Sequence, residues 1–242
     1  QICGGHERFA ILAASLCHDF GHPALNNQFL IETQDPLAIT YNDKSPLENM
    51  HCTKLFELLQ NPSTSIFEEL DRASYFEARK VCVGAILHTD MYYHLPMIKS
   101  LEMLYEGNAT TFNLGAEMHM ADEAAFPSPA AAECLRARDA RGELLHLILH
   151  ISDTSSPTKP FPVCREWAIR VMDECFAQGD QEKELGVPVG PLNDRDQTEM
   201  CWTQMGFIEF AAPLYFVTVK LLPPYVGAAA GAVDNMQAWQ KL

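Results

Sequence analysis

The protein has 242 residues, of which 48% are hydrophobic, so the chain is long enough to form one large core or two small ones. Its 32 Asp and Glu residues outnumber 17 Lys and Arg, and the formal net charge of −15 argues against nucleic acid or anionic membranes as general partners. An anionic small substrate remains compatible with this charge if a bound metal ion reverses the local field.

Apolar residues recur with helical spacing along the chain and strict alternation is rare, which predicts a single all-α domain. The apolar run 9–16 should form a first, buried helix. This helix should end near Asp19, because Gly21 and Pro23 follow. Asn26 should open a short helix. A capping box from Ser45 to Glu48 should start the next one, over residues 46–60.

Further along the chain, helices are predicted at 67–70, 73–90, 95–105, 144–153, 163–185 and 198–222, with a weak one at 234–242. Pro213 should kink the helix at 198–222. Residues 107–132 have poor periodicity and contain a Pro-Ser-Pro sequence, so they are predicted to be a surface loop.

A His-Asp pair at the end of the first helix is the first candidate metal site. His18 offers an imidazole that suits zinc, and Asp19 offers a carboxylate that can also bridge to magnesium or manganese. One further helical turn would bring His22 to the same side. Asp153 ends another predicted helix, and together these groups resemble an incomplete metal cage.

Each of these residues also has a structural interpretation. The His-Asp pair could satisfy itself, Asp153 could cap a turn before Pro157, and Glu48 could serve only its capping box. Thr89-Asp90-Met91 could be a simple helix end. Their joint occurrence in this order favours a site.

Gln204 and Phe207 are three residues apart, so a helix would place the amide and the ring on one face. The amide could read a purine edge and the ring could stack on it. Alternatively, Phe207 packs in the core and Gln204 is solvated.

Several motifs in one order resemble class I 3',5'-cyclic nucleotide phosphodiesterases of the HD superfamily. The similarity covers nearly the whole chain and rests on His18-Asp19-Phe20-Gly21-His22-Pro23, Tyr41-Asn42-Asp43-Lys44-Ser45-Pro46-Leu47-Glu48-Asn49-Met50-His51, Leu87-His88-Thr89-Asp90-Met91, His150-Ile151-Ser152-Asp153, Gln178-Gly179-Asp180 and Gln204-Met205-Gly206-Phe207-Ile208.

This resemblance implies a compact helical bundle with the metal site at helix ends in a central pocket. It implies hydrolysis of cAMP, cGMP or both to 5'-nucleoside monophosphates in cyclic nucleotide signalling, by a hydroxide that bridges zinc and magnesium (or manganese). By resemblance, the zinc ligands are His18, Asp19 and Asp153, with Asp19 shared by the second ion. The residues that would order water around that ion are His22, Glu48, Thr89 and Asp90.

The resemblance also implies a purine site. Gln204 would bind the base, Phe207 and Val171 would clamp it, and Met91 would border the pocket. Ser156, on the substrate side, stands where cAMP-selective members often have Asn, and Cys164 stands where some members have Tyr. We therefore expect both nucleotides to be accepted.

The family's H-N-x-x-H and H-A-x-D motifs have no match here, so residues 1–242 are expected to be a catalytic domain without its N-terminal portion, which holds one metal histidine and the general acid. The fragment alone should be inactive. His88, His94, His119 and His146 lack matching contexts and are expected to be structural. Two rival hypotheses stay open: an inactive module that binds cyclic nucleotides, and an HD-type hydrolase of another nucleotide.

Cysteine usage bears on location. The eight cysteines are scattered without a C-x-x-C pair, which indicates an intracellular, cytoplasmic protein. The apolar tract 207–222 is interrupted by Pro213 and charged residues, so no direct membrane insertion is expected, and any membrane attachment would use other parts of the protein. Fused regulatory domains and homodimers remain open.

Overall fold

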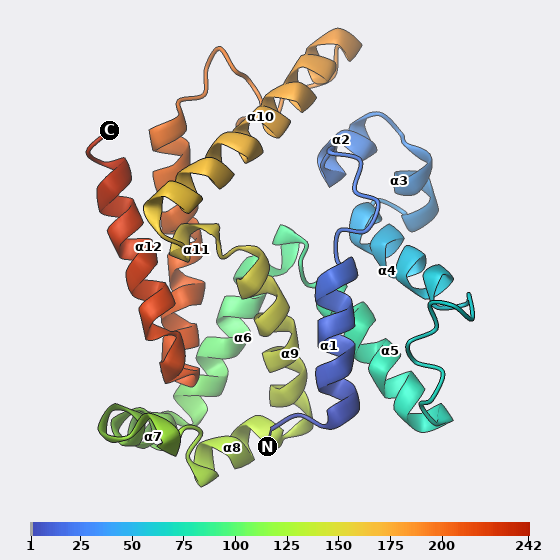
Figure 1. The fold of residues 1–242 in the computed structure, drawn as a ribbon. Helices are drawn as coiled ribbons and strands as arrows, with labels where there is room; N and C mark the ends of the chain where they lie inside the picture. Colours follow the sequence, from blue (N-terminus) through green and yellow to red (C-terminus); the bar gives the residue numbers. More distant parts are fainter. Residues whose placement is uncertain (1) are drawn as a thin grey trace.

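The computed structural model describes residues 2–242, where all the regular elements are helices, so the all-α prediction is confirmed (Figure 1). None of the described helices has the length and hydropathy needed to cross a membrane. The α-helices are α1 Gly5–Cys17, α2 Asn27–Glu32, α3 Pro36–Tyr41, α4 Pro46–Leu58, α5 Arg72–Leu87, α6 His94–Gly107, α7 Ala109–Ala121, α8 Pro129–Arg136, α9 Arg138–Asp153, α10 Phe161–Leu185, α11 Met200–Leu221 and α12 Val226–Trp239.

The helices form two principal cores that share one helix. The first joins α1, α4 and α5, and the second joins α6 to α12. Helix α9 belongs to both, because Leu149 packs in the first core while Leu147 and Ile151 pack in the second. Figure 1 shows α9 between the α1 side and the α11 side of the molecule. The first core therefore holds α1 and the second holds most of α9, so that these two helices end near each other between the cores.

The predicted surface loop at 107–132 is wrong, because it contains α7 and α8 with a short 3₁₀ turn between them. Ser128 caps α8, its side chain accepting from the Ala131 amide at 3.3 Å. Phe112 of α7 and Leu135 of α8 are both buried in the second core. Tertiary packing thus stabilises α7, whose sequence has little periodicity.

Three local predictions also need correction, and one helix was missed. Helix α1 forms on the predicted residues, but Leu12 is 63% and Leu16 87% exposed, so the run 9–16 buries only one side. Residues 67–70 form turns rather than a helix, and α3 was not predicted. The last helix begins at Val226 and is longer than expected. The cap at Asn26 is confirmed, since its side chain accepts from the Phe29 amide at 2.9 Å.

The predicted capping box at the start of α4 is wrong as well. Ser45 has a left-handed backbone (φ 45°) and its side chain makes no capping hydrogen bond. Its hydroxyl instead donates to Asp90 Oδ2 at 2.7 Å, and the Glu48 carboxylate accepts from Asn27 at 2.9 Å. Both side chains therefore connect α4 to other segments.

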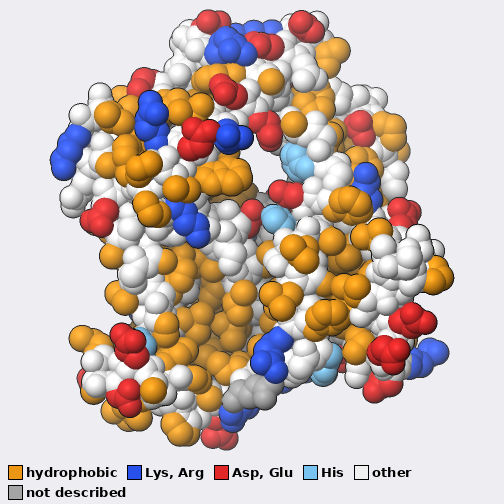
Figure 2. Space-filling model, in the orientation of Figure 1, with side chains coloured by type: hydrophobic (Ala, Val, Ile, Leu, Met, Phe, Trp, Pro, Cys, Tyr) orange, Lys and Arg blue, Asp and Glu red, His pale blue; other side chains and the backbone are white. Residues whose placement is uncertain are grey.

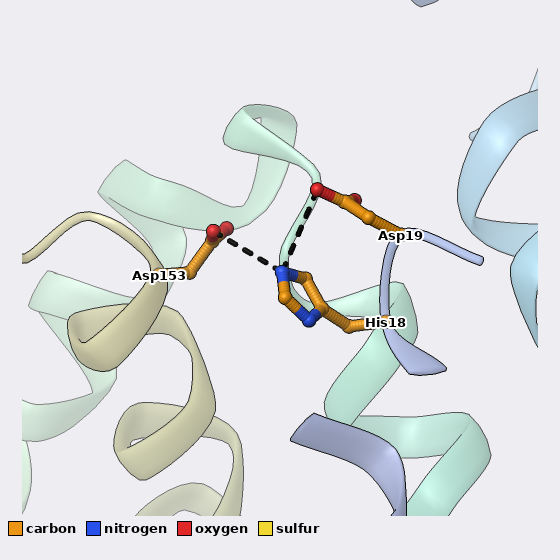
Figure 3. A group of neighbouring side chains, drawn as sticks. All are labelled: His18, Asp19 and Asp153. Carbon is orange, nitrogen blue, oxygen red and sulfur yellow. Dashed lines mark ion pairs between the residues drawn. The ribbon is translucent and has the colours of Figure 1, made fainter. Parts of the chain in front are cut away.

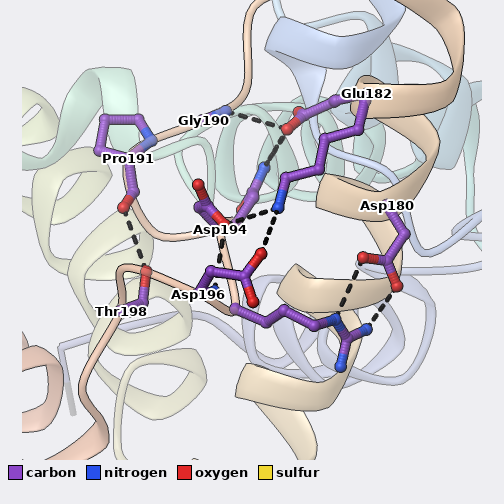
Figure 4. Close-up of polar contacts among 10 residues, drawn as sticks. Asp180, Glu182, Gly190, Pro191, Asp194, Asp196 and Thr198 are labelled. Carbon is purple, nitrogen blue, oxygen red and sulfur yellow. Dashed lines mark hydrogen bonds and ion pairs between the residues drawn. The ribbon is translucent and has the colours of Figure 1, made fainter.

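The connection from α10 to α11 is held against α10 by polar contacts (Figure 4). Lys183 pairs with Asp194 at 2.7 Å and with Asp196 at 3.1 Å, and Arg195 pairs with Asp180. Figure 4 also shows Glu182 accepting from the Gly190 amide, at 2.9 Å. This segment carries Leu192, which lines the cavity described next.

Candidate active site

His18, Asp19 and Asp153 converge where α1 and α9 end, as Figure 3 shows. His18 Nε2 lies 3.3 Å from Asp153 Oδ1 and 3.6 Å from Asp19 Oδ2, and ligand atoms of all three lie within 4.8 Å of one another. The imidazole is mostly covered, whereas the Asp19 carboxylate is 60% exposed. The structure thus brings together the three predicted metal ligands.

The backbone of α1 fixes the orientation of the His18 ring. His18 Nδ1 donates to the Ser15 carbonyl at 2.9 Å, which leaves Nε2 facing the two carboxylates. The hydrogen bond to Asp153 is the largest of the effects that raise the pKa of His18 to about 9. In metal-free protein the imidazole is therefore protonated at neutral pH, and a metal ion would take the place of that proton.

His51 joins this cluster and was absent from the predicted site. Its Nδ1 donates to the Phe20 carbonyl at 3.1 Å, and its Nε2 lies 3.8 Å from Asp19 Oδ1. This Nε2 is buried without a hydrogen-bond partner, and burial lowers the pKa of His51. An unpaired nitrogen lone pair beside a carboxylate fits a site completed by an ion or its bound water. The only sequence signal was the motif Glu48-Asn49-Met50-His51.

The residues predicted to order water lie in an adjoining cavity rather than beside His18. A cavity of about 890 Å³ is lined by His22, Glu48, Thr89 and Asp90. The chain leaves α1 at Cys17 and turns at Gly21 (φ 78°), so His22 does not continue the helical face of His18. Instead its ring stacks near that of His51, with the ring centroids 5.8 Å apart.

Asn27 and Ser45, which sequence analysis did not select, organise the acidic side of this second cavity. The Asn27 amide donates to Glu48 at 2.9 Å and to Asp90 at 3.4 Å, and its oxygen accepts from the Leu47 amide at 3.0 Å. Burial is the main cause that raises the pKa of Glu48 to about 7, and the charge of Asp90 adds to it. The two carboxylates are thus held close together by neutral donors.

The predicted substrate residues surround a cavity of about 700 Å³ that opens from the metal cluster. It is lined by His18, Asp19, Met91, Asp153, Ser156, Val171, Gln204 and Phe207, among others. Met91 also lines the second cavity, so it lies at the boundary between the two. Figure 2 shows acidic and histidine side chains at the rim of an opening between the α10 and α2 sides.

Gln204 and Phe207 share one face of α11, as predicted from their spacing. Gln204 is 9% exposed, and no side-chain hydrogen bond to another residue of 2–242 is formed, so its amide remains available to a ligand. Cys164 differs, because it is buried within α10 and is not part of the cavity wall.

Four histidines form a separate group between α5, α6 and α9, in which His94 and His150 are buried and His88 and His146 are half-buried. The rings of His88 and His146 stack with centroids 3.8 Å apart, and His94 Nδ1 lies 2.9 Å from His150 Nε2. They contact one another, helix backbone and two aromatic rings, since His88 packs on Tyr93 and His94 on Phe210.

Comparisons with known proteins agree with this geometry. Residues 1–230 match the family model described as 3'5'-cyclic nucleotide phosphodiesterase. The chain is 32% identical over 234 residues to 3',5'-cyclic-AMP phosphodiesterase 4C of Rattus norvegicus, spanning 96% of this chain and 40% of that protein. It is 30% identical to a probable 3',5'-cyclic-AMP phosphodiesterase of Caenorhabditis elegans, again over 96% of this chain but 32% of the relative.

A solved structure is similar over the whole chain. The phosphodiesterase domain of a fusion protein from the choanoflagellate Salpingoeca rosetta superposes with a TM-score of 0.84 at 27% sequence identity. The match covers 100% of this chain and 70% of that one. The present chain thus spans less than half of the two curated relatives and about two thirds of this solved domain.

Proposed function

Because the chain belongs to the 3'5'-cyclic nucleotide phosphodiesterase family, we propose that its protein hydrolyses 3',5'-cyclic nucleotides to 5'-nucleoside monophosphates in cyclic nucleotide signalling, with residues 1–242 in its catalytic domain. One observation carries this proposal. The cluster of His18, Asp19 and Asp153 lies at one end of a cavity whose walls include Gln204 and Phe207. A phosphate group and a purine could therefore be bound at the same time in one cavity.

The metal cluster would hold the ion that contacts the phosphate. One imidazole nitrogen and two carboxylates suit zinc, and the exposed Asp19 carboxylate can be shared with magnesium or manganese. When bound, these ions would activate water as the nucleophile and neutralise the phosphate charge, which explains how a protein of net charge −15 accepts an anion.

The residues of the second cavity would position water. His22 Nδ1 accepts from the Ala24 amide at 3.0 Å, so a neutral imidazole carries its proton on Nε2. The Thr89 hydroxyl donates to the Ile86 carbonyl at 2.7 Å and retains an acceptor lone pair. Together with Glu48 and Asp90, these groups offer both donors and acceptors to ordered water.

The purine would lie between Phe207 and Val171, with its edge toward Gln204. Val171 is 52% exposed, as expected for a residue that a ligand covers. Since Ser156 is a small hydroxyl residue and no described contact fixes the Gln204 amide, either amide orientation is available. We propose that both cAMP and cGMP are substrates, within about a hundredfold in kcat/KM. The scattered spacing of the eight cysteines, without a C-x-x-C pair, supports an intracellular location.

This test and those that follow use the full-length protein. It compares Asp19→Asn and Asp153→Asn with Asp234→Asn, an exposed acidic residue on α12. The first two should lose bound metal and at least a thousandfold in kcat for cAMP, since mispositioning both the phosphate and the nucleophile removes about 4 kcal/mol or more. Asp234→Asn should retain metal and activity. If Asp19→Asn kept a tenth of the wild-type kcat, the assignment would be wrong.

The alternative is a module that binds cyclic nucleotides without hydrolysis. Wild-type protein that binds cAMP and metal but releases no 5'-AMP would favour it. In the hydrolase, Gln204→Ala should lower kcat/KM by about ten- to a hundredfold and leave metal content unchanged.

A further inference from the structure

The segment between α9 and α10, residues 154–160, is the wall segment of the substrate cavity. It follows Asp153 directly, and Ser155, Ser156 and Lys159 all line the cavity. Lys159 is the only Lys or Arg among the described lining residues. Because the substrate is anionic and the protein is acidic, the position of this segment decides whether the Lys159 charge lies close to the substrate.

The wall segment satisfies few of its own backbone groups, because its only regular element is the short 3₁₀ helix Ser156–Thr158. Pro157 and Pro160 lack amide hydrogens. The internal backbone bonds are those from the Thr158 amide to Ser155 (2.9 Å) and from the Lys159 amide to Ser156 (3.3 Å). The Pro157 and Lys159 carbonyls are left to find donors elsewhere.

Asn235 of α12 supplies both of these donors. Its Nδ2 donates to the Pro157 carbonyl at 2.6 Å and to the Lys159 carbonyl at 2.7 Å. Two carbonyl partners require the NH₂ group of the amide at this position. Asn235 is 3% exposed and is not among the residues that line the substrate cavity. Its contacts with the wall segment are therefore made from behind.

Close packing of α12 and α11 supports the same contact. A Cβ on Gly231, one turn before Asn235, would lie 2.7 Å from the Thr158 carbonyl oxygen, so glycine permits this approach. On α11, the buried Tyr215 hydroxyl donates to the Thr154 carbonyl at 2.6 Å. The wall segment is thus held at its start by α11 and at its end by α12.

We propose that Asn235 is a positioning residue for the substrate cavity, holding the wall segment so that Ser156 and Lys159 face the bound nucleotide. This inference rests on the proposed function. Asn235 contacts the second half of the wall segment, at Pro157 and Lys159, whereas Asp153 precedes the segment and is held by α9 itself. Loss of the Asn235 contacts should therefore weaken nucleotide binding and leave the metal cluster in place.

The test uses Asn235→Asp, which has nearly the same shape but places acceptor oxygens against two carbonyls. Thr218→Val is the matched control, because Thr218 is fully buried on α11 and its hydroxyl donates only to the Leu214 carbonyl, at 2.7 Å. For cAMP, Asn235→Asp should raise KM by about ten- to a hundredfold, with kcat within threefold and metal content unchanged. Thr218→Val should lose stability without a change in KM.

Hydrogen exchange supplies a readout independent of activity. In Asn235→Asp the peptide covering 154–160 should exchange at least tenfold faster, while α9 and α10 keep their protection. If Asn235→Asp does not fold, Asn235→Ser, which retains one donor, should show a smaller shift in the same two measurements.

The inference is overturned if exchange in 154–160 is unchanged, or if exchange rises while KM for cAMP stays at the wild-type value. Wild-type protein that hydrolyses no cyclic nucleotide would contradict the proposed function instead. In that case, faster exchange in 154–160 together with weaker cAMP binding would still support the positioning role of Asn235, and unchanged binding would exclude it.

Discussion

The histidines between α5 and α9 should make the fold sensitive to acid. Burial is the main cause that lowers the pKa of both His146 and His150 to about 4, with neighbouring histidines adding to the effect. Unfolded histidine titrates near pH 6.5. The unfolded chain therefore binds more protons than the folded one as pH falls below 6.5, and stability declines until the folded groups also titrate near pH 4.

His146 offers the sharper test, because its Nδ1 is buried without a partner and its main described contact is the ring stack with His88. With pKa values of about 4 folded and 6.5 unfolded, this one group costs about 2 kcal/mol of stability between pH 7.5 and pH 5. The substitution His146→Leu removes that cost. It should change the free energy of unfolding little at pH 7.5, because the loss of the ring contact is offset by the removal of a buried nitrogen that has no hydrogen-bond partner.

Urea unfolding of metal-free protein at pH 7.5 and pH 5 measures the difference directly. The decline in unfolding free energy between the two pH values should be about 2 kcal/mol smaller in His146→Leu than in wild type. His119→Leu is the control, since the contacts of His119 are local, with the Glu123 carbonyl and the Phe126 ring. An equal decline in wild type and His146→Leu would refute the reasoning.

Two further predictions concern packing and charge. Gly179→Ala should destabilise the fold by about 2 kcal/mol or more, because the new Cβ would lie 2.0 Å from the Asn193 carbonyl oxygen. Gly142→Ala is the control and should be neutral or stabilising, because its Cβ would have no atom within 4 Å. Thermal unfolding of the two variants measures the difference. The pKa of Glu48 is raised to about 7, so the buried carboxylate costs stability as pH rises from 4.5 through 7. In EDTA, Glu48→Gln should escape this loss and gain up to about 3 kcal/mol relative to wild type between pH 4.5 and pH 8, and parallel pH profiles would contradict the assignment.

The sequence predicted helices best where their apolar spacing matches a buried face. The long helices α5, α9, α10 and α11 fall close to the predicted ranges. The pattern failed for α7, where Thr, Asn and Gly interrupt the apolar positions and burial depends on α8 and α11. It also overstated the burial of α1, since only its alanine side packs on α5.

The residues of the candidate site likewise divide into those that the sequence could predict and those that it could not. His18, Asp19 and Asp153 could be selected because each lies in a recognisable local motif at a helix end. Asn27 and His51 could not, since their roles consist of contacts to residues distant in sequence or to backbone carbonyls. The sequence from Ser45 to Glu48 matches a capping box, but the left-handed backbone of Ser45 directs its hydroxyl to Asp90, to which it donates a hydrogen bond.

The place of α9 between the two cores gives the metal cluster a mechanical role. His18 and Asp19 follow α1, which belongs to the first core, while Asp153 ends α9, which packs mainly in the second core and reaches the first through Leu149. A metal ion bound by all three would cross-link the two cores across most of the chain's length. Metal binding would thus add to the coupling that α9 already provides between the two cores, and chelation would weaken that coupling.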